Sequence, residues 1–310
     1  MTNLGTTDLS VFPLCLGGNV FGWTADRAAS FAVLDAYAAA GGNFVDTADV
    51  YSVWQPGGTG GESETVIGEW LRARGNRDSI VVATKGSQLP PHQGLGAASI
   101  KGAAEASLRR LGVDTIDLYY AHRDDGDTPV EETVAAYDEL VRAGKVRHVA
   151  ASNVSTERIA ESLAFAEKEG LAAYVAIQPH YNLMERTGFE QDVAPFAAEH
   201  NLATLPYFAL ARGFLTGKYR PGSTVDSPRA GQASAYLTER GLRVLDALDA
   251  VAGAHQVPVA AVALAWLAAQ PGVSAPIASA RSTEQLADLL PVGELTLTEA
   301  ELTALTEASN

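Results

Sequence analysis

The stretch NFVDTADVY, residues 43–51, begins as an apolar run and ends in polar side chains, among them Asp46 and Tyr51. Two later stretches have the same design: IVVATK ends at Lys85, and IDLYYAH ends at His122. Short apolar runs of this kind are typical of the buried strands of a parallel sheet. Because neighbouring strands lie about 4.8 Å apart, we expect these four side chains to meet at one edge of the sheet.

Short apolar runs alternate with segments of helical period along the whole chain, a pattern that indicates repeated βα units. The strand candidates are residues 13–16, 43–46, 80–84, 116–121, 146–151, 175–178, 203–206 and 273–277. The helix candidates between them are residues 27–40, 62–74, 100–111, 129–143, 156–169 and 192–200, with additional helices at 235–255 and 298–308. Eight such units predict an α/β fold of the (β/α)8 TIM-barrel type, preceded by a β-hairpin that turns near Gly5.

Residue types at the helix ends support these boundaries. Ser99 is a predicted N-cap, Pro129 suits a first helical turn, and Gly41 and Gly144 are predicted to end helices. The segments 86–99 and 207–235 are longer than the usual loop of about 4–6 residues. Both follow strand ends, which is the side where barrels of this type carry their active sites.

Composition limits the kind of protein. A chain of 310 residues is expected to form one barrel domain over 1–310, and a net charge of −15 without a basic run makes nucleic acid an unlikely partner. The single cysteine, Cys15, excludes an intrachain disulfide, and no signal-peptide pattern opens the sequence, so we expect a cytoplasmic protein. The most apolar stretch, 257–269, is shorter than the roughly 20 residues that cross a bilayer, so no membrane association is expected.

The four strand-end residues have the chemistry of a proton-donating site. A phenol has a reference pKa near 10, and a nearby ammonium such as Lys85 would stabilise the phenolate of Tyr51 and lower its pKa. A carboxylate such as Asp46 would keep a buried Lys85 charged. His122 could donate a hydrogen bond to a carbonyl oxygen that gains negative charge. The set therefore predicts carbonyl reduction.

Structural explanations exist for each residue alone. Asp46 and Lys85 could form an ion pair at the barrel rim. Tyr51 could be a wall residue, and His122 a core histidine. One titratable residue of a suitable type at each of three adjacent strand ends favours the catalytic interpretation.

A metal-dependent barrel hydrolase is a further alternative. Its candidate ligands would be Asp46, Asp49, His122, Asp124 and Asp125. No His-x-His pair ends the first strand, and Lys85 would bring a positive charge to the site in place of a ligand.

Seven motifs resemble the aldo-keto reductases, in the family's order and over nearly the whole chain. They are NFVDTADVY, GGESETVIGEWL, IVVATK, SLRRLGVDTIDLYYAH, GKVRHVAASN, IQPHYNL and LARGFLTGKY. The resemblance is to bacterial-type members and to the group that includes potassium-channel β subunits. It implies that Asp46, Tyr51, Lys85 and His122 form the catalytic tetrad, with Tyr51 as the general acid. It also implies direct hydride transfer from NADPH, with NADH possible, and no metal.

The same resemblance implies cofactor contacts. Ser152, Asn153 and Gln178 match residues that hold the nicotinamide carboxamide, and Tyr207 matches the aromatic residue that stacks on the nicotinamide ring. The other cofactor candidates are Gly18, Asn19, Leu210, Arg212, Lys218, Ser279, Arg281 and Gln285.

Charge and position distinguish the roles of these other candidates. Arg281 and Gln285 match the segment around the adenosine 2′-phosphate, where a guanidinium suits a phosphate. Arg212 and Lys218 are candidates for the pyrophosphate, and Gly18 begins the turn after strand one. The absence of a Gly-x-Gly-x-x-Gly fingerprint argues against a Rossmann domain.

The sequence departs from the family pattern in places. Phe208 and Ala209 replace a Ser-Pro pair, which removes a serine hydroxyl that often lies near phosphate. Ala278 and Ser279 replace a Pro-Gly pair, and Leu289 stands where an asparagine is expected. We expect one phosphate contact and the adenine contacts to differ.

The substrate side is predicted to be apolar and open. Trp23, Trp54 and Phe21 are candidate walls of the pocket, with Phe208 as a further one. The expected partner is a small-molecule carbonyl compound, and the protein is expected to be a monomer or a small homo-oligomer. Resemblance to the channel β subunits leaves a second alternative, a nicotinamide-binding regulatory module with little turnover.

Overall fold

Eight parallel strands close into a barrel in the computed structural model, which describes residues 1–310. Their order around the barrel is β10-β3-β4-β5-β6-β7-β8-β9. They are β3 (Cys15–Gly17), β4 (Phe44–Asp46), β5 (Val81–Gly86), β6 (Ile116–Ala121), β7 (Val146–Ser152), β8 (Tyr174–Gln178), β9 (Ala203–Thr204) and β10 (Ile277–Ala278). At the seam between β9 and β10, the Ser274 N–H donates to the Thr204 carbonyl at 2.9 Å. The Ile277 N–H donates to the Pro206 carbonyl at 2.9 Å, so the predicted barrel is confirmed.

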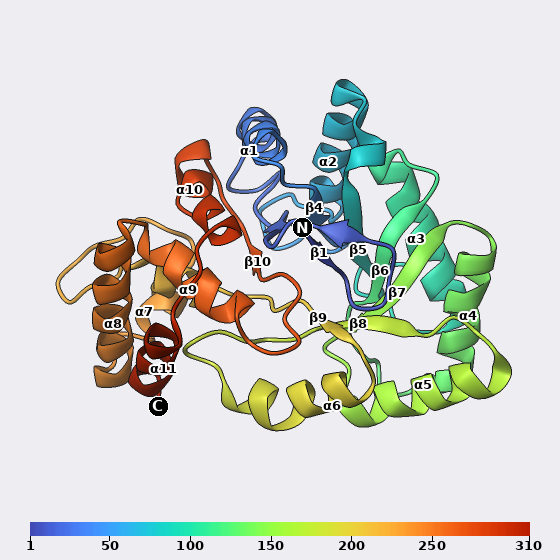
Figure 1. Cartoon of the computed structure of the whole chain (residues 1–310). Helices are drawn as coiled ribbons and strands as arrows, with labels where there is room; N and C mark the ends of the chain where they lie inside the picture. The colour runs from blue at the N-terminus through green and yellow to red at the C-terminus, as the bar shows by residue number, and fades with distance from the viewer.

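Helices surround the strands, and the later ones gather on one side of the barrel (Figure 1). They are α1 (Arg27–Ala39), α2 (Glu62–Arg74), α3 (Ala97–Leu111), α4 (Val130–Arg142), α5 (Thr156–Glu169), α6 (Ala194–Glu199), α7 (Ala230–Ser234), α8 (Glu239–His255), α9 (Val259–Ala268), α10 (Thr283–Ala287) and α11 (Glu299–Ala308). Short 3-10 helices lie at η1 (Arg77–Ser79), η3 (Ala211–Thr216) and η4 (Leu290–Gly293), and a π-helix, η2 (Phe189–Val193), leads into α6.

Most predicted helix ends agree with the structure, but three starts were wrong. The helix predicted at 235–255 begins at Glu239, with Thr238 as its N-cap. Ser99 is not an N-cap, because α3 begins at Ala97 with Gly96 as its N-cap. The Ser99 hydroxyl donates instead to the Gln93 carbonyl at 2.7 Å, which ties the helix to the preceding loop. Pro129 stands at the N-cap position of α4 and not in its first turn.

Glycine supplies the left-handed backbone where the chain leaves α1 and α4. Gly41 and Gly144 each follow the C-cap residue, with φ of 85° and 70°. The predicted N-terminal hairpin is also present, formed by β1 (Thr2–Asn3) and β2 (Ser10–Val11). Gly5 has φ of 54° in its turn, a conformation that glycine adopts without steric cost.

Two apolar clusters hold the fold together. The inner cluster fills the barrel with strand side chains such as Phe44 and Leu118. Leu4 and Leu9 of the hairpin extend it and cover the N-terminal end of the barrel. The outer cluster packs the helices onto the strands and includes Trp266 of α9.

The apolar stretch 257–269 becomes α9, a helix that the sequence analysis did not predict. Eight of its ten residues, Ala260 to Leu267, are buried, so its apolar composition reflects packing inside the protein. No single helix has the length and apolar composition of a membrane span, although α8 and α9 taken together across a 99° bend would reach it.

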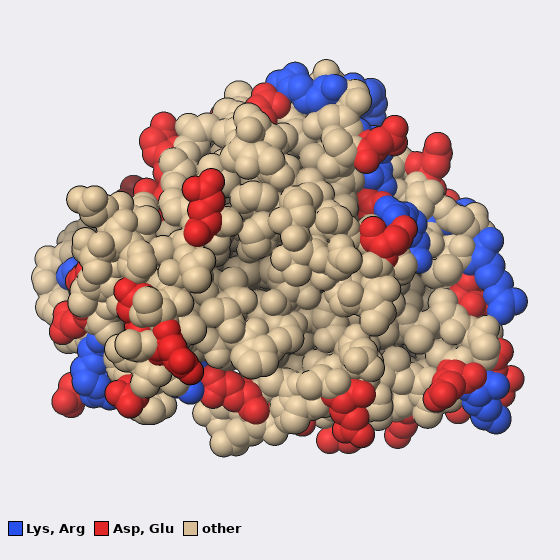
Figure 2. Space-filling model, in the orientation of Figure 1, with Lys and Arg blue, Asp and Glu red and all other residues tan.

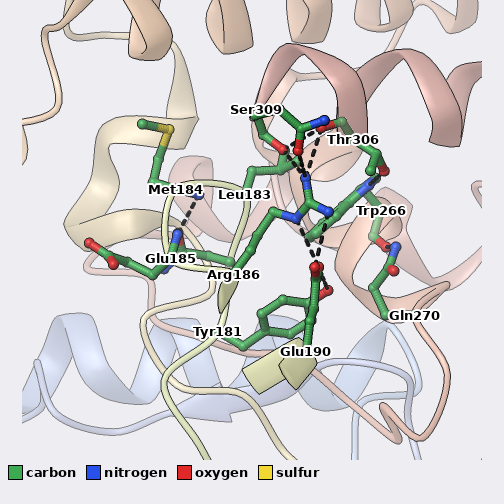
Figure 3. A network of polar contacts seen from close by, with 12 residues as sticks. Tyr181, Leu183, Met184, Glu185, Arg186, Glu190, Trp266, Gln270, Thr306 and Ser309 are labelled. Atoms are coloured by element: carbon green, nitrogen blue, oxygen red, sulfur yellow. Dashed lines mark hydrogen bonds and ion pairs between the residues drawn. The ribbon is translucent and has the colours of Figure 1, made fainter. Parts of the chain in front are cut away.

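Arg186 joins the segment after β8 to the last helix, as Figure 3 shows. Its guanidinium donates to both carboxylate oxygens of Glu190 at 2.8 and 3.0 Å. It also donates to the Thr306 carbonyl at 2.8 Å and to Ser309 Oγ at 2.7 Å. The segment that borders the carboxyl end of the barrel is therefore fixed in place by α11.

An ion-pair network lies at the N-terminal end of the barrel. Asp117 on β6 is buried, and its two oxygens form ion pairs with Arg77 and Arg147, each at 2.8 Å. Arg147 also donates to the exposed Asp8 at 2.7 Å. A hollow of about 770 Å³ is lined by these paired groups. On the face seen in Figure 2, charged side chains lie mainly around the rim, where Lys and Arg neighbour Asp and Glu.

Candidate active site

The carboxyl ends of β4, β5 and β6 bring four titratable side chains together. Lys85 Nζ donates to Asp46 Oδ2 at 2.6 Å and to Tyr51 Oη at 3.0 Å. His122 directly follows β6, and its ring lies edge-on to the Tyr51 ring with centroids 6.3 Å apart. The sequence-predicted residues therefore share one site.

The pair of Asp46 and Lys85 is buried and fully hydrogen-bonded. Lys85 Nζ makes a third bond to the Thr47 carbonyl at 2.8 Å, and Asp46 Oδ1 accepts from Gln178 Nε2 at 2.9 Å. Burial lowers the pKa of Lys85, but attraction to Asp46 and Tyr51 outweighs it and raises the pKa above its ordinary value. A buried ion pair whose donors are all used is stable enough to keep the ammonium charged.

Tyr51 has a pKa above its ordinary value of 10. Burial raises it, and the positive charge of Lys85 opposes the rise without cancelling it. Lys85 acts in the predicted direction, but the expected net lowering was wrong because desolvation of the phenolate is the larger effect. At neutral pH the phenol therefore carries its proton.

His122 is kept neutral by its surroundings. Burial lowers its pKa well below 6.5, and the charges of Lys85 and Arg123 lower it further. Its Nδ1 is buried without a hydrogen-bond partner. A neutral imidazole can still donate one hydrogen bond to a group that enters the site.

Polar side chains from β7 and β8 form a second group beside the four. Ser152 Oγ donates to the Gln178 carbonyl at 3.1 Å, and Asn153 Nδ2 donates to the His122 carbonyl at 3.0 Å. Asn153 Oδ1 in turn accepts from Tyr207 Oη at 2.9 Å. The group offers amide and hydroxyl partners of the kind that a carboxamide needs.

His180 is a site residue that the sequence analysis did not single out. Its ring stacks on Tyr207 with centroids 5.3 Å apart and an interplanar angle of 11°. It follows Gln178 by two residues in the IQPHYNL motif, so its position next to a predicted contact was the available signal. A cavity of about 450 Å³ opens here, lined by Asn153, Gln178 and His180 among others.

The turn after β9 has a left-handed backbone at several non-glycine positions. Phe208, Ala211 and Arg212 have φ of 52°, 46° and 60°. The N–H groups of Ala209 and Leu210 donate no hydrogen bond within the protein. Alternating backbone of this kind forms a concavity of N–H groups that suits an anion, which offers donors in place of the absent serine hydroxyl.

Cations without a carboxylate partner gather around this end of the barrel. They are Arg123, Arg212, Lys218, Arg229 and Arg281. In contrast, most Lys and Arg side chains of the outer helices are ion-paired. Unpaired guanidinium groups in a protein of net charge −15 indicate a site for an anionic ligand.

Arg229 was missed by the sequence analysis, although it lies in the long segment 207–235. Burial lowers its pKa, and the neighbouring charges of Arg212 and Arg281 lower it further. Its guanidinium lies 5.9 Å from the centre of the Trp23 ring. A partly buried cation near other cations is stabilised when a phosphate joins it.

Comparison with known proteins identifies the family. The sequence profile of the Aldo/keto reductase family matches residues 13–310. The chain belongs to this family. It is 34% identical to "Uncharacterized oxidoreductase YrpG" of Bacillus subtilis (strain 168), over 99% of this chain and 94% of that protein.

Other relatives differ in their named roles. The "Probable voltage-gated potassium channel subunit beta" of Oryza sativa subsp. japonica is 34% identical over 92% of this chain and 88% of its own length. The "Norsolorinic acid reductase" of Aspergillus flavus is 32% identical over 96% of this chain and 78% of its own length. The family and its oxidoreductase members make this aldo/keto reductase an oxidoreductase of a family that uses NAD(P)H.

The glycine-rich turn after β3 packs closely against the centre of this aldo/keto reductase. The Gly18 N–H donates to the Asp46 carbonyl at 2.7 Å, and a Cβ at Gly18 would lie 2.8 Å from Ser63 Oγ. Asn19 Oδ1 accepts from Ser279 Oγ at 2.7 Å, which joins the segments that follow β3 and β10. These predicted cofactor residues therefore lie beside Asp46 and between the ends of β3 and β10.

The segment around α10 matches the family pattern only in part. Gln285 Oε1 accepts from the Arg281 N–H at 3.0 Å, which holds the two predicted residues side by side. Leu289, which stands where the family has an asparagine, is buried in the outer apolar cluster. It therefore cannot replace a polar contact of that asparagine with a ligand. Partial burial of its ammonium group and the charge of Arg281 lower the pKa of Lys218, although the residue as a whole is exposed.

Two of the three predicted pocket residues, Trp23 and Trp54, form an aromatic cluster with Tyr51. The Trp23 and Trp54 rings meet edge to face with centroids 5.6 Å apart, and Trp54 lies 5.9 Å from the Tyr51 ring. Trp54 is 46% exposed. Phe21 does not line the pocket, because its side chain has no exposed surface and belongs to the outer apolar cluster.

The donors of the hydrolase alternative do not converge on one point. No three His, Cys, Asp or Glu side chains are grouped as a metal site would require. Asp124 pairs with Arg158 at 3.2 Å, and Asp125 accepts from the Leu95 N–H at 2.6 Å. Both aspartates therefore hold loops together.

Proposed function

We propose that this aldo/keto reductase reduces aldehydes or ketones to alcohols with NADPH, and that Tyr51 is the general acid. The observation that carries the proposal is the bond from Lys85 Nζ to Tyr51 Oη, inside the buried pair with Asp46. A phenol held against an ammonium can release a proton because the phenolate it leaves is stabilised by that charge.

The groups that surround the opening fit a nicotinamide nucleotide. Ser152, Asn153 and Gln178 would hold the carboxamide, and the Tyr207 ring, backed by His180, would support the nicotinamide. The remaining predicted contacts would bind the phosphates and the adenosine. These are Gly18, Asn19, Leu210, Arg212, Lys218, Ser279, Arg281 and Gln285, to which we add Arg229.

The bound nucleotide would supply a hydride to the carbonyl carbon. Tyr51 then gives its proton to the carbonyl oxygen, so that the two transfers together make an alcohol. The phenolate that remains is stabilised by Lys85 at 3.0 Å and regains a proton from water. Asp46 keeps Lys85 charged through this cycle.

His122 would orient the carbonyl group. Its imidazole is neutral, because its pKa lies well below 6.5 through burial and the charges of Lys85 and Arg123. The hydrogen bond from a neutral donor to the carbonyl oxygen becomes stronger as that oxygen gains negative charge. It leaves the proton transfer itself to Tyr51.

Charge at the far end of the opening supports NADPH over NADH. Arg281 makes no ion pair, and Lys218 lies close enough for its pKa to be lowered by the Arg281 charge. A 2′-phosphate between two such cations would relieve their repulsion, and NADH lacks that phosphate.

The Tyr51→Phe variant tests the proposal. It removes the proton donor and keeps the ring, so kcat/KM for carbonyl reduction should fall by about 10²–10⁴-fold while NADPH still binds. Tyr174→Phe is the matched control, since it removes a buried hydroxyl that lies on β8 outside the four-residue group. Near-normal reduction by Tyr51→Phe would refute the role of Tyr51.

A binding module with little turnover is the second candidate, favoured by the similarity to the rice protein named as a channel β subunit. One measurement, the oxidation of bound NADPH by carbonyl compounds, distinguishes the reductase from the binding module. Tight NADPH binding together with no oxidation of NADPH across a broad panel of aldehydes and ketones would favour the binding module.

A further inference from the structure

Asp49 is a buried carboxyl group that the proposed chemistry does not use. It lies in the turn between Asp46 and Tyr51, and only 1% of its surface is exposed. Neither of its carboxyl oxygens has a hydrogen bond of good geometry, and the backbone N–H groups of Leu89 and Val50 lower its pKa less than burial raises it. A buried ionised carboxylate without partners is costly, so this group needs a neutral form or a change of position.

The groups that face Asp49 come from four elements. They are Glu64 on α2, Arg110 on α3, Tyr119 on β6 and Tyr137 on α4. Arg110 Nε donates to Glu64 Oε2 at 2.6 Å, so the one nearby cation is already paired. An ionised Asp49 would therefore be a second carboxylate beside a single guanidinium.

Both carboxylate oxygens of Glu64 already accept hydrogen bonds. Its carboxylate is buried, and its other oxygen accepts from the Thr84 hydroxyl at 2.6 Å. Thr84 directly precedes Lys85 on β5. The pair of Glu64 and Arg110 is thus anchored to the strand that carries the proposed catalytic lysine.

The backbone of Asp49 joins the same strand. Its N–H donates to the Lys85 carbonyl at 2.9 Å, and the Tyr51 N–H donates to the Ala48 carbonyl at 3.3 Å within the turn. A Cβ at Gly60 would lie 2.9 Å from the Asp49 carbonyl oxygen, so the turn is closely packed. A shift of the Asp49 backbone would therefore change the position of Tyr51 relative to Lys85.

We propose that Asp49 is a positioning residue: its neutral carboxyl holds the Tyr51 turn against Lys85, and its ionisation shifts the turn and slows carbonyl reduction. The proposal rests on the proposed role of Tyr51.

The pH range follows from the surroundings of the group. Burial raises the pKa of Asp49 to about 7, with the negative charge of Glu64 as the next cause. In the unfolded chain the pKa is about 3.9. The neutral form therefore stabilises the folded protein fully below about pH 4, and this contribution is lost as the pH rises to about 7.

The experiment compares the full-length wild type with Asp49→Asn, a neutral side chain of the same shape. The control is Asp246→Asn, an exposed aspartate on α8 without an ion pair. The ratio of kcat for Asp49→Asn to kcat for the wild type, with saturating NADPH, should rise from about 1 at pH 6 to about 3 or more at pH 8.5. The melting temperature of Asp49→Asn should exceed that of the wild type at pH 8.5 and match it more closely at pH 5.

Each outcome decides the proposal. A ratio of kcat values that stays constant with pH, while the difference in melting temperature grows, would show that Asp49 titrates without moving Tyr51 and would overturn it. A difference in melting temperature that stays constant from pH 5 to pH 8.5 would show that Asp49 does not titrate in this range, and it would also overturn the proposal. If neither protein reduces any carbonyl compound, the proposed function fails, and amide exchange of residues 47–53 at pH 8.5 decides the rest. Faster exchange in the wild type than in Asp49→Asn supports the positioning role, and equal exchange overturns it.

Discussion

The two ends of the barrel treat charge in opposite ways. At the N-terminal end, Asp117 is buried and each of its oxygens forms an ion pair with a guanidinium, one from Arg77 and one from Arg147. At the carboxyl end, Lys85 is shared between a carboxylate and a phenol, and the cations around Arg281 have no carboxylate partner. The charged groups at the N-terminal end are therefore paired within the protein, whereas the cations at the carboxyl end need an anionic ligand to be paired.

This difference separates stability from chemistry. Substitutions at the N-terminal end should change the free energy of unfolding and leave the activity per folded molecule unchanged. Substitutions at the carboxyl end should change catalysis or ligand binding, because the groups there have unused bonding capacity. The following four substitutions test that division, in order of expected effect.

The largest effect is expected for Lys85→Met. Methionine has a similar length but no charge, so the phenolate of Tyr51 loses its stabilisation, and kcat/KM for carbonyl reduction should fall by about 10³-fold. NADPH binding, measured by fluorescence titration, should change little because Lys85 lies among the proton-transfer groups. Activity within about threefold of the wild type would contradict the role of the ammonium.

Asp117→Ala should cost stability at the other end. It leaves two guanidinium groups without their buried partner, so urea unfolding should show a loss of about 3–5 kcal/mol. Asp8→Ala, which removes the exposed partner of Arg147, is the control and should cost less than about 1 kcal/mol. A large loss of kcat in Asp117→Ala, measured well below its melting temperature, would break the proposed division between the two ends.

Arg281→Ala should alter the choice of nucleotide. Loss of a charged bond to the 2′-phosphate should reduce the ratio of kcat/KM for NADPH to that for NADH by about 10-fold or more. Arg72→Ala is the control, because Arg72 is an unpaired, exposed guanidinium near the end of α2. An unchanged ratio in Arg281→Ala would assign the discrimination to another residue.

Trp54→Ala should give the smallest effect. Loss of a half-exposed aromatic wall should raise KM for aromatic aldehydes by about threefold relative to small aliphatic ones, with kcat nearly unchanged. Val53→Ala, an equally exposed neighbour, is the control. Equal changes in KM for both substrate classes would place Trp54 outside the pocket.

The sequence predicted the repeating fold well because its signal is local. Short apolar runs located the eight strands, although the last was predicted at 273–277 and overlaps β10 (Ile277–Ala278) at one residue only. The helices 62–74 and 156–169 were predicted to the residue. The start of α3 was missed because Gly96 gives no side-chain signal, whereas Ser99 does. The helix α9 was missed because a segment buried on all sides lacks the alternation of an amphipathic helix.

The site was predicted less completely because some of its features depend on tertiary contacts. Phe21 looked like a pocket residue from its neighbours, but the chain turns its ring into the core. Arg229 and His180 were missed because only folding places them beside Trp23 and Tyr207. The net rise in the Tyr51 pKa was also unpredictable, since it depends on how much of the phenol is buried.

The pairing of β3 with β10 has a consequence for biosynthesis. Cys15 of β3 pairs with Ile277 of β10, so the first barrel strand lacks one of its two neighbours until the last barrel strand has been synthesised. While a ribosome makes the chain, β3 and β9 are open edges that could pair with another nascent chain. The rate at which residues after 204 emerge and fold should therefore govern how much newly made protein aggregates, and slow translation of that last third would be harmful.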